Sequence, residues 1–423
     1  MNDLKRNAFF WGLILALLII GGILFSPVSG DAPFYLSTAR DVSRGLIPYR
    51  DINLSYTPLV MYINAVILFL FHQPPYFTFL IFQYLVIMLS ALALYRISIR
   101  MGLSRLKAIF LSIFFSICIL SSDGHFINLE VYSILFVLLS YLAMMQKKFL
   151  LSGFFLALTF FCKQYGILNF VPFLLLFLFS EKLKIRPFFK FCLGAIIPVA
   201  LFVGYFCVLK DTDGTDLLMQ LTGQGYGEKN IAETKTVLGF LNGAKVFILM
   251  LLPIFFYKFN PFNNTIRMSL SIGILVMLLP VVVQSFQHYF LNAFPYIAIL
   301  FITVWKQYEI RWLPVHLSLV IVSSLLIVRI VNHAEKGFTQ RKVATALLET
   351  YPKGTTVYLK GQTNYLYLLN DYSNPALKTA GYSYIYKTND AFLKNNTVLT
   401  FDRIRDKVPE RIISVDGTKI YEY

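Results

Sequence analysis

Long apolar runs recur along most of the chain, separated by short segments that carry Lys and Arg. This alternation restricts what the chain can fold into. Of its 423 residues, 57% are hydrophobic and 14% are charged, a balance typical of polytopic membrane proteins and foreign to soluble domains. We therefore predict an all-α polytopic membrane protein with about eleven transmembrane helices and additional juxtamembrane helices. The predicted spans are approximately residues 8–26, 76–95, 106–122, 127–145, 149–162, 166–180, 191–209, 241–258, 268–284, 289–305 and 312–331.

The placement of the positive charges argues for the same class. The formal net charge is +16, but a nucleic-acid-binding protein would gather its basic residues on one soluble face. Here they form short groups between apolar runs, as in cytoplasmic loops. We therefore expect no nucleic acid partner, and predict a multi-pass protein of the plasma (inner) membrane with a cytoplasmic N-terminus. The first apolar run is expected to be a retained helix, because no small-x-small cleavage site follows it.

The run Leu59–Phe71 decides the predicted topology. It is short for a membrane span, and counting it as a crossing would put the basic loop between 96 and 107 outside. The positive-inside rule favours a juxtamembrane or re-entrant helix instead. Four polar segments then fall on the outer side of the membrane. They are the first loop with Asp31, the segment from Asp123 to Glu130, the turn Lys163–Tyr165, and the segment Gln284–Tyr289.

The composition changes at residue 332. Residues 332–423 are mixed and polar, and they contain no apolar run of spanning length. A helix is predicted at Arg341–Thr350, and strands at 356–360, 397–401, 412–415 and 419–423, the last two joined by an Asp-Gly turn. We therefore divide the chain into a transmembrane domain, 1–331, and a small α+β domain, 332–423, on the outer face.

The first loop, Pro27–Pro58, is the leading candidate for a functional site. Carboxylates at a membrane surface are costly and usually functional. Asp31 is predicted to be the N-cap of a short interfacial helix that ends near Gly45. On that helix, Asp41 is expected to face water.

Several motifs in this chain resemble those of the GT-C class of membrane glycosyltransferases, the bacterial relatives of protein O-mannosyltransferases and lipid A aminoarabinose transferase. The similar stretches are GDAPFYL (30–36), GLIPYRD (45–51), YTPLVMY (56–62), LTFFCKQYG (158–166) and HYFLNAFPY (288–296). In one respect the chain departs from the class. Many relatives carry a Lys before paired prolines that binds the lipid phosphate, whereas the matching stretch here, residues 55–58, has none.

The resemblance implies an enzyme that moves a hexosyl or pentosyl group, usually with inversion, from a polyprenyl-phosphate-linked donor to a lipid, glycan or protein acceptor on the outer face. Such a reaction needs a base for the acceptor hydroxyl, and Asp31 is the candidate. It also needs cations near the departing phosphate, and Lys163, His288 and Arg50 are the candidates.

Six further residues are candidates for contact with the donor or the acceptor. Further substrate-binding candidates are Asp51, Tyr56, His125, Glu130, Gln164 and Tyr289. No metal or other cofactor is expected, and the alternative is a divalent cation held by Asp123 and Glu130. Besides substrates, the partners are membrane lipids. Two other functions stay open: a flippase or transporter of lipid-linked sugars, for which no internal repeat is found, and an O-antigen ligase or polymerase.

Overall fold

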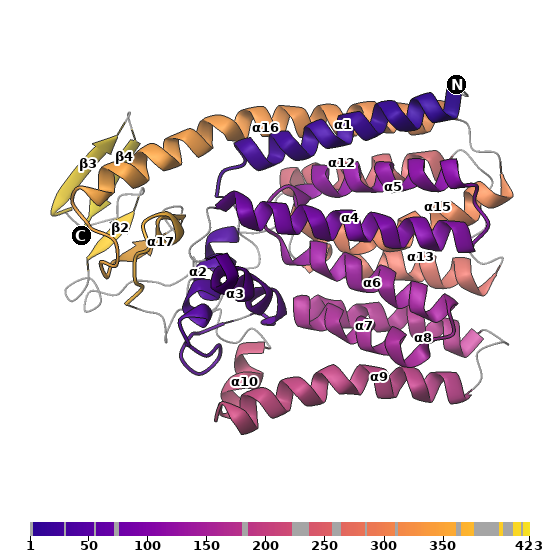
Figure 1. Ribbon diagram of the computed structural model, residues 1–423, viewed down its shortest axis with the longest axis horizontal. Helices are drawn as coiled ribbons and strands as arrows, with labels where there is room; N and C mark the ends of the chain where they lie inside the picture. The colour runs from indigo at the N-terminus through magenta and orange to yellow at the C-terminus, as the bar shows by residue number, and fades with distance from the viewer. Residues whose placement is uncertain are drawn as a thin grey trace. The chain divides into compact units, whose positions relative to one another are not determined.

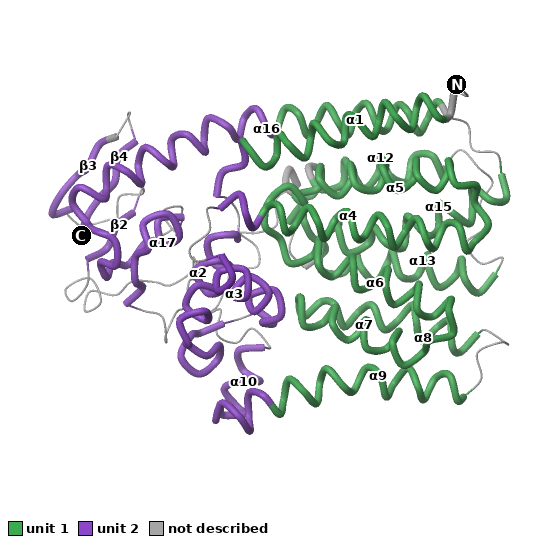
Figure 2. Tube along the Cα trace, in the orientation of Figure 1, with its two compact units in different colours: residues 1–24, 80–204, 230–329 green, residues 25–79, 205–229, 330–423 purple. Residues whose placement is uncertain are grey.

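A computed structural model of the chain shows a helical bundle and a small four-stranded sheet (Figure 1). It describes residues 3–28, 31–54, 56–71, 76–179, 185–221, 237–255, 264–283, 286–308, 312–360, 365–375, 397–400, 409–415 and 418–423. The chain forms two compact units (Figure 2). Unit 1 contains residues 1–24, 80–204 and 230–329, and unit 2 contains residues 25–79, 205–229 and 330–423.

Unit 1 is a bundle of helices that lie side by side with roughly parallel axes (Figure 1). In a bilayer, each backbone N–H and C=O must be satisfied within the protein, so apolar runs of this length form helices. The elements of unit 1 are α1 (Asp3–Phe25), α4 (Tyr76–Arg100), α5 (Arg105–Ile119), η1 (Leu120–Gly124), α6 (Leu129–Met145), α7 (Phe149–Cys162), η2 (Gln164–Asn169), α8 (Phe170–Phe179), α9 (Ile185–Val203), α12 (Val237–Phe255), α13 (Thr265–Met277), α14 (Leu279–Val283), η5 (Gln287–Ala293), α15 (Phe294–Gln307) and the first half of α16 (Trp312–Leu348).

Every predicted span coincides with a helical segment. In the described chain, seven helices are long and apolar enough to cross a membrane, and shorter apolar helices occupy the remaining predicted spans. The helical membrane fold is thus confirmed, while the number of crossings stays a prediction. One helix differs from expectation: α16 has 37 residues, so it continues through the predicted boundary at residue 331 and includes most of the helix expected at Arg341–Thr350. The division at that residue stays a prediction.

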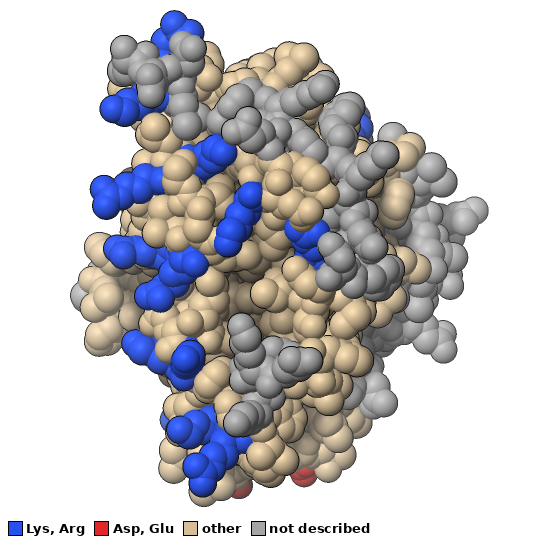
Figure 3. Space-filling view, turned by 90° about the vertical axis from the view of Figure 1, so that its right-hand side faces the viewer, with Lys and Arg blue, Asp and Glu red and all other residues tan. Residues whose placement is uncertain are grey.

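The two ends of unit 1 differ in charge. Lys and Arg gather on the face shown in Figure 3, where the Asp and Glu drawn in colour lie only at the margin. Most of the exposed or half-exposed basic residues that the structure describes in unit 1 stand at one end of its helices: Lys5, Arg6, Arg96, Arg100, Arg105, Lys107, Lys147, Lys148, Arg186, Lys190 and Lys306. Lys245, within α12, and Arg329, which pairs with Asp123, are the exceptions. The opposite ends of α5, α6, α7 and α15 lead to the segments containing Asp123, Glu130, Lys163 and His288. This asymmetry is what the positive-inside rule requires of a cytoplasmic end and an outer end.

Unit 2 combines helices with the sheet. Its elements are α2 (Ala32–Ser43), α3 (Leu59–Phe71), η3 (Gly204–Leu209), α10 (Gly214–Leu221), the second half of α16, β1 (Tyr358–Lys360), α17 (Tyr365–Leu369), β2 (Val398–Thr400), β3 (Arg411–Val415) and β4 (Thr418–Glu422). All four predicted strands are therefore confirmed. The sheet has the order β1-β2-β4-β3, and β3 pairs with β4 antiparallel with Ile413 opposite Ile420, as the predicted hairpin requires. The 13 residues of α3 span about 20 Å, less than the hydrocarbon core of about 30 Å.

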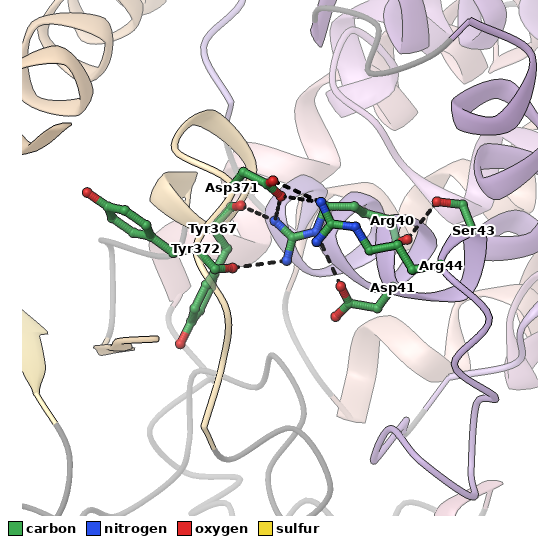
Figure 4. A network of polar contacts seen from close by, with 7 residues as sticks. All are labelled: Arg40, Asp41, Ser43, Arg44, Tyr367, Asp371 and Tyr372. Atoms are coloured by element: carbon green, nitrogen blue, oxygen red, sulfur yellow. Dashed lines mark hydrogen bonds and ion pairs between the residues drawn. The ribbon is translucent and has the colours of Figure 1, made fainter. Parts of the chain in front are cut away.

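Arg40 ties α2 to the segment that follows α17. Its guanidinium donates hydrogen bonds to the carbonyl oxygens of Tyr367 and Tyr372 and to Asp371 Oδ1, and it also pairs with Asp41 at 3.2 Å (Figure 4). Arg40 and Asp41 are 7% and 5% exposed. The expectation that Asp41 faces water was therefore wrong. Residues 32–41 of α2 are all buried, because the C-terminal part of the chain covers the polar side of the helix as well.

Labelling should place the two ends of unit 1 on opposite sides of the membrane. Ser104 lies at the basic end and Phe286 at the other, and both are exposed. In a background with Cys192 and Cys207, the two partly exposed native cysteines, changed to Ser, an impermeant maleimide should label Phe286→Cys on intact cells. It should label Ser104→Cys only after permeabilisation. Labelling of both from one side would contradict the predicted topology.

The Arg40 network should be essential to unit 2. Arg40→Lys keeps the charge but cannot donate to all four groups from one planar fork, so we expect unit 2 to lose about 2–4 kcal/mol of stability. The readout is faster amide hydrogen exchange in residues 365–375. Arg44→Lys is the matched control, since Arg44 also pairs with Asp371 but its side chain is 44% exposed, which makes that pair weak. If Arg40→Lys and Arg44→Lys speed hydrogen exchange equally, the buried contacts of Arg40 add no stability to unit 2.

Candidate active site

Lys163 lies where α7 ends, in a turn fixed by close backbone packing. Gly166 N–H donates to the Lys163 carbonyl oxygen at 2.8 Å, and Thr159 Oγ1 donates to the Gly166 carbonyl oxygen at 2.9 Å. A Cβ at Gly166 would lie 2.1 Å from the Thr159 carbonyl oxygen, so only glycine fits there. The turn therefore brings Lys163 into the bundle, where the residue is only 4% exposed.

Glu130 is the partner of Lys163. Lys163 Nζ forms a short ion pair with Glu130 Oε1, and the Glu130 side chain is fully buried. Glu130 is the second residue of α6, capped by Asn128, whose side chain accepts from Glu130 N–H at 3.3 Å. The positive end of the helix dipole favours a carboxylate at this position. Glu130 Oε2 is buried and has no hydrogen-bond partner among the described residues.

Aromatic and imidazole groups complete the cluster. His288 Nε2 lies 3.9 Å from Glu130 Oε1. Lys163 Nζ stands 4.4 Å from the ring centre of Tyr289 and 6.0 Å from that of Tyr165, within reach of a cation–π interaction. Three of the four segments predicted on the outer side thus meet around one ammonium group. We call Glu130, Lys163, His288 and Tyr289 the Lys163 cluster; Gln164, the next residue of that turn, is half-buried.

A second ion pair lies beside the cluster in unit 1. Arg329 donates to Asp123 Oδ1 at 2.8 Å, to the Ser121 carbonyl oxygen at 3.1 Å and to Gln287 Oε1. Asp123 sits in the π-helical turn η1 with φ of 69°, a conformation that is unusual for residues other than glycine. Short π segments of this kind often occur at functional sites.

The remaining candidate in this region, His125, belongs to the same turn. It is 1% exposed, and its Nδ1 lies 2.8 Å from the Leu120 carbonyl oxygen. The two carboxylates considered as ligands of a divalent cation are each paired with a cationic side chain: Asp123 with Arg329, and Glu130 with Lys163. No group of three His, Cys, Asp or Glu suited to a metal ion occurs in the described part of the chain.

The candidates of the first loop lie in unit 2. Asp31 precedes α2 but makes no capping hydrogen bond; its Oδ2 instead accepts from the Tyr35 hydroxyl at 3.0 Å. The Tyr35 ring packs edge-on against Tyr56, with centroids 5.5 Å apart. The carboxylate of Asp31 is therefore available for other chemistry.

Arg50 and Asp51 neutralise each other. Their side chains pair at 2.9 Å, and Asp51 Oδ2 also accepts from Ile47 N–H. The hydrogen bonds that Arg50 donates to Asp51, together with the negative charge of that carboxylate, raise the pKa of the Arg50 guanidinium. Since Arg50 is exposed whereas Lys163 is buried, the Lys163 cluster is the stronger candidate for phosphate binding.

Comparison with known proteins identifies the fold. No protein-family model matches the chain, and no curated protein matches it. Among solved structures, ArnT from Cupriavidus metallidurans bound to undecaprenyl phosphate superposes with a TM-score of 0.70, covering 99% of this chain and 98% of that one at 11% identity. The apo form of ArnT gives a TM-score of 0.51 over 99% and 97% at 11% identity.

The chain has the ArnT fold. The GT-C-like architecture predicted from the sequence is thereby confirmed. At 11% identity the likeness to ArnT extends to the fold alone, so the roles of individual residues stay predictions.

Sequence reasoning missed Arg329. This residue lies within the predicted last span, in the run SLLIVRIV. An arginine inside an apolar span is costly and usually faces the protein interior or a functional cavity. That rule would have identified it within the ArnT-like bundle, although not its partners Asp123 and Gln287, which lie 206 and 42 residues away.

The Lys163–Glu130 pair should show strong coupling in a double-mutant cycle. Lys163→Met leaves a buried carboxylate without its cation, and we expect it to cost about 3–5 kcal/mol. The double change Glu130→Gln/Lys163→Met removes both charges and should recover at least half of that loss. Thermal unfolding in detergent measures the stability of the single and the double variant. A Lys163→Met protein as stable as the wild type would show that the two groups are not paired.

Proposed function

We propose that this protein is an integral membrane glycosyltransferase that moves a sugar from a polyprenyl-phosphate donor to an acceptor on the outer face of the membrane. One observation carries the proposal: an ArnT fold over 99% of the chain, with a structure of ArnT bound to undecaprenyl phosphate as the comparison. The buried Lys163 cluster supports it, because an ammonium at the end of a membrane bundle suits a lipid phosphate.

The Lys163 cluster supplies what the departing group needs. When the bond between the anomeric carbon and the phosphate oxygen breaks, negative charge grows on that oxygen. Lys163, with His288 as a hydrogen-bond donor, would stabilise this charge in a site shielded from water, where such interactions are strongest. Tyr289 and Tyr165 hold the ammonium in place from its sides. These residues also take the role of the lysine that residues 55–58 lack.

Asp31 is the proposed base. The acceptor hydroxyl oxygen attacks the anomeric carbon from the side opposite the phosphate, which inverts the configuration, and the hydroxyl proton passes to the Asp31 carboxylate. Support comes from the lack of a capping hydrogen bond at Asp31 and from the hydrogen bond donated by Tyr35, which orients the carboxylate. Glu130, Gln164, His125, Tyr56, Asp51 and Arg50 remain proposed contacts to donor or acceptor.

The donor is identified by assay. Purified protein in nanodiscs is given a panel of polyprenyl-phosphate hexoses and pentoses together with a membrane extract as acceptor source, and mass spectrometry identifies the products. We expect transfer from at least one donor, with release of polyprenyl phosphate. Donor that crosses the bilayer of proteoliposomes without product would support a flippase instead. A product formed only from a diphosphate-linked glycan would support a ligase or polymerase.

Asp31→Asn should nearly abolish transfer. The change preserves size and an oxygen for Tyr35 while removing the proton acceptor, so we expect a rate loss of about 10²–10⁴-fold with undecaprenyl phosphate binding unchanged. The control is Asp216→Asn, a carboxylate of unit 2 that is exposed on α10, which should transfer at the wild-type rate. Wild-type activity of Asp31→Asn would assign the base to another carboxylate.

A further inference from the structure

The basic end of unit 1 contains a compact group of cations at the turn between α4 and α5. Arg100 ends α4, Arg105 and Lys107 begin α5, and Lys306 stands at the end of α15. None of these four forms an ion pair with an Asp or Glu in the described ranges, whereas Arg329 and Lys163 at the other end of unit 1 are both paired. Among the described residues, the turn therefore holds positive charge without an acidic partner.

Two contacts hold the lysines of this turn in place. Lys107 Nζ stands 5.8 Å from the ring centre of Trp305. Trp305 is 3% exposed and is itself held edge-on by Phe301, with centroids 5.3 Å apart. The indole is thus a rigid wall against which the ammonium of Lys107 rests, so this lysine loses less freedom when it binds an anion.

Lys306 reaches the same turn from the end of α15. Gly102, in the turn after α4, has φ of 94°, a left-handed conformation that favours glycine. A Cβ built on Gly102 would lie 3.5 Å from Lys306 Nζ, so the ammonium lies close to the backbone of the turn. Lys107 and Lys306 therefore approach this turn from α5 and α15.

We propose that this turn binds the headgroup of an anionic phospholipid in the leaflet at the basic end of the bundle. The group lies at the end of membrane-spanning helices, where lipid phosphates are the most abundant anions, and basic pockets between helices on this side recognise anionic headgroups. Charge complementarity favours this ligand, as does the lack of an acidic partner in the described ranges. The site is separate from the Lys163 cluster, since α5 and α15 each run between the two ends of unit 1.

The test measures binding of phosphatidylglycerol and phosphatidylethanolamine to the full-length protein, purified without added undecaprenyl phosphate, by native mass spectrometry. We expect phosphatidylglycerol to be retained in preference to phosphatidylethanolamine. Lys107→Gln/Lys306→Gln should weaken phosphatidylglycerol binding about 30-fold, because two lysine contacts to an anionic lipid are lost. Both side chains reach the surface, so the fold should survive, and the thermal unfolding midpoint checks this.

The control removes the same charge from the same end. Arg186→Gln/Lys190→Gln changes two exposed cations at the start of α9 and should leave phosphatidylglycerol binding within about threefold of wild type. If both double variants lose phosphatidylglycerol binding equally, the binding depends on diffuse surface charge and the proposed site is wrong. Binding of sn-glycerol 3-phosphate as tight as that of phosphatidylglycerol would overturn the lipid assignment. No sugar donor is involved, so the outcome does not depend on the proposed glycosyl transfer.

Discussion

The buried ion pair between Lys163 and Glu130 is the constraint on which the proposed site depends. Removing two charges from water costs several kcal/mol for each ion, and apolar residues of similar size would pack there at no such cost. The pair joins the end of α7 to the start of α6, and Tyr289 and His288 reach it from η5. Because burying two charges is costly, a role in binding an anion gives the pair a physical reason.

The charge distribution of unit 1 separates two kinds of environment along the same helices. At one end, Arg100, Arg105, Lys107 and Lys306 form no ion pair with an acidic residue in the part of the chain that the structure describes. At the other, Lys163 and Glu130 are buried and paired, and Arg329 and Asp123 are half-buried and paired. This polarity agrees with a reaction confined to one side of the membrane. It is also hard to reconcile with a transporter, whose polar residues are expected near the membrane midplane.

Much of the fold could be predicted from the sequence because its main determinants are local. Apolar runs that form membrane helices, and an Asp-Gly pair that marks a hairpin, can each be recognised from a short stretch of sequence. Lys163 was found as a charge between two apolar runs. Contacts over long separations could not be read in this way. Arg40 meets Asp371 across 331 residues, and so Asp41 was wrongly placed in water, because helical periodicity does not reveal what covers the polar side. The change of composition at residue 332 suggests that the helix ends there, but α16 continues to Leu348, because a polar segment can extend a helix beyond its apolar part.

The most direct test of the account is the position of the phosphate. An electron cryomicroscopy structure of the protein in nanodiscs with undecaprenyl phosphate would locate it, with Lys163→Met/Glu130→Gln protein as the comparison. We expect phosphate density within hydrogen-bonding distance of Lys163 Nζ and beside His288, and no such density in the double variant. Phosphate density bound elsewhere, with the Lys163–Glu130 pair intact and out of contact, would contradict it.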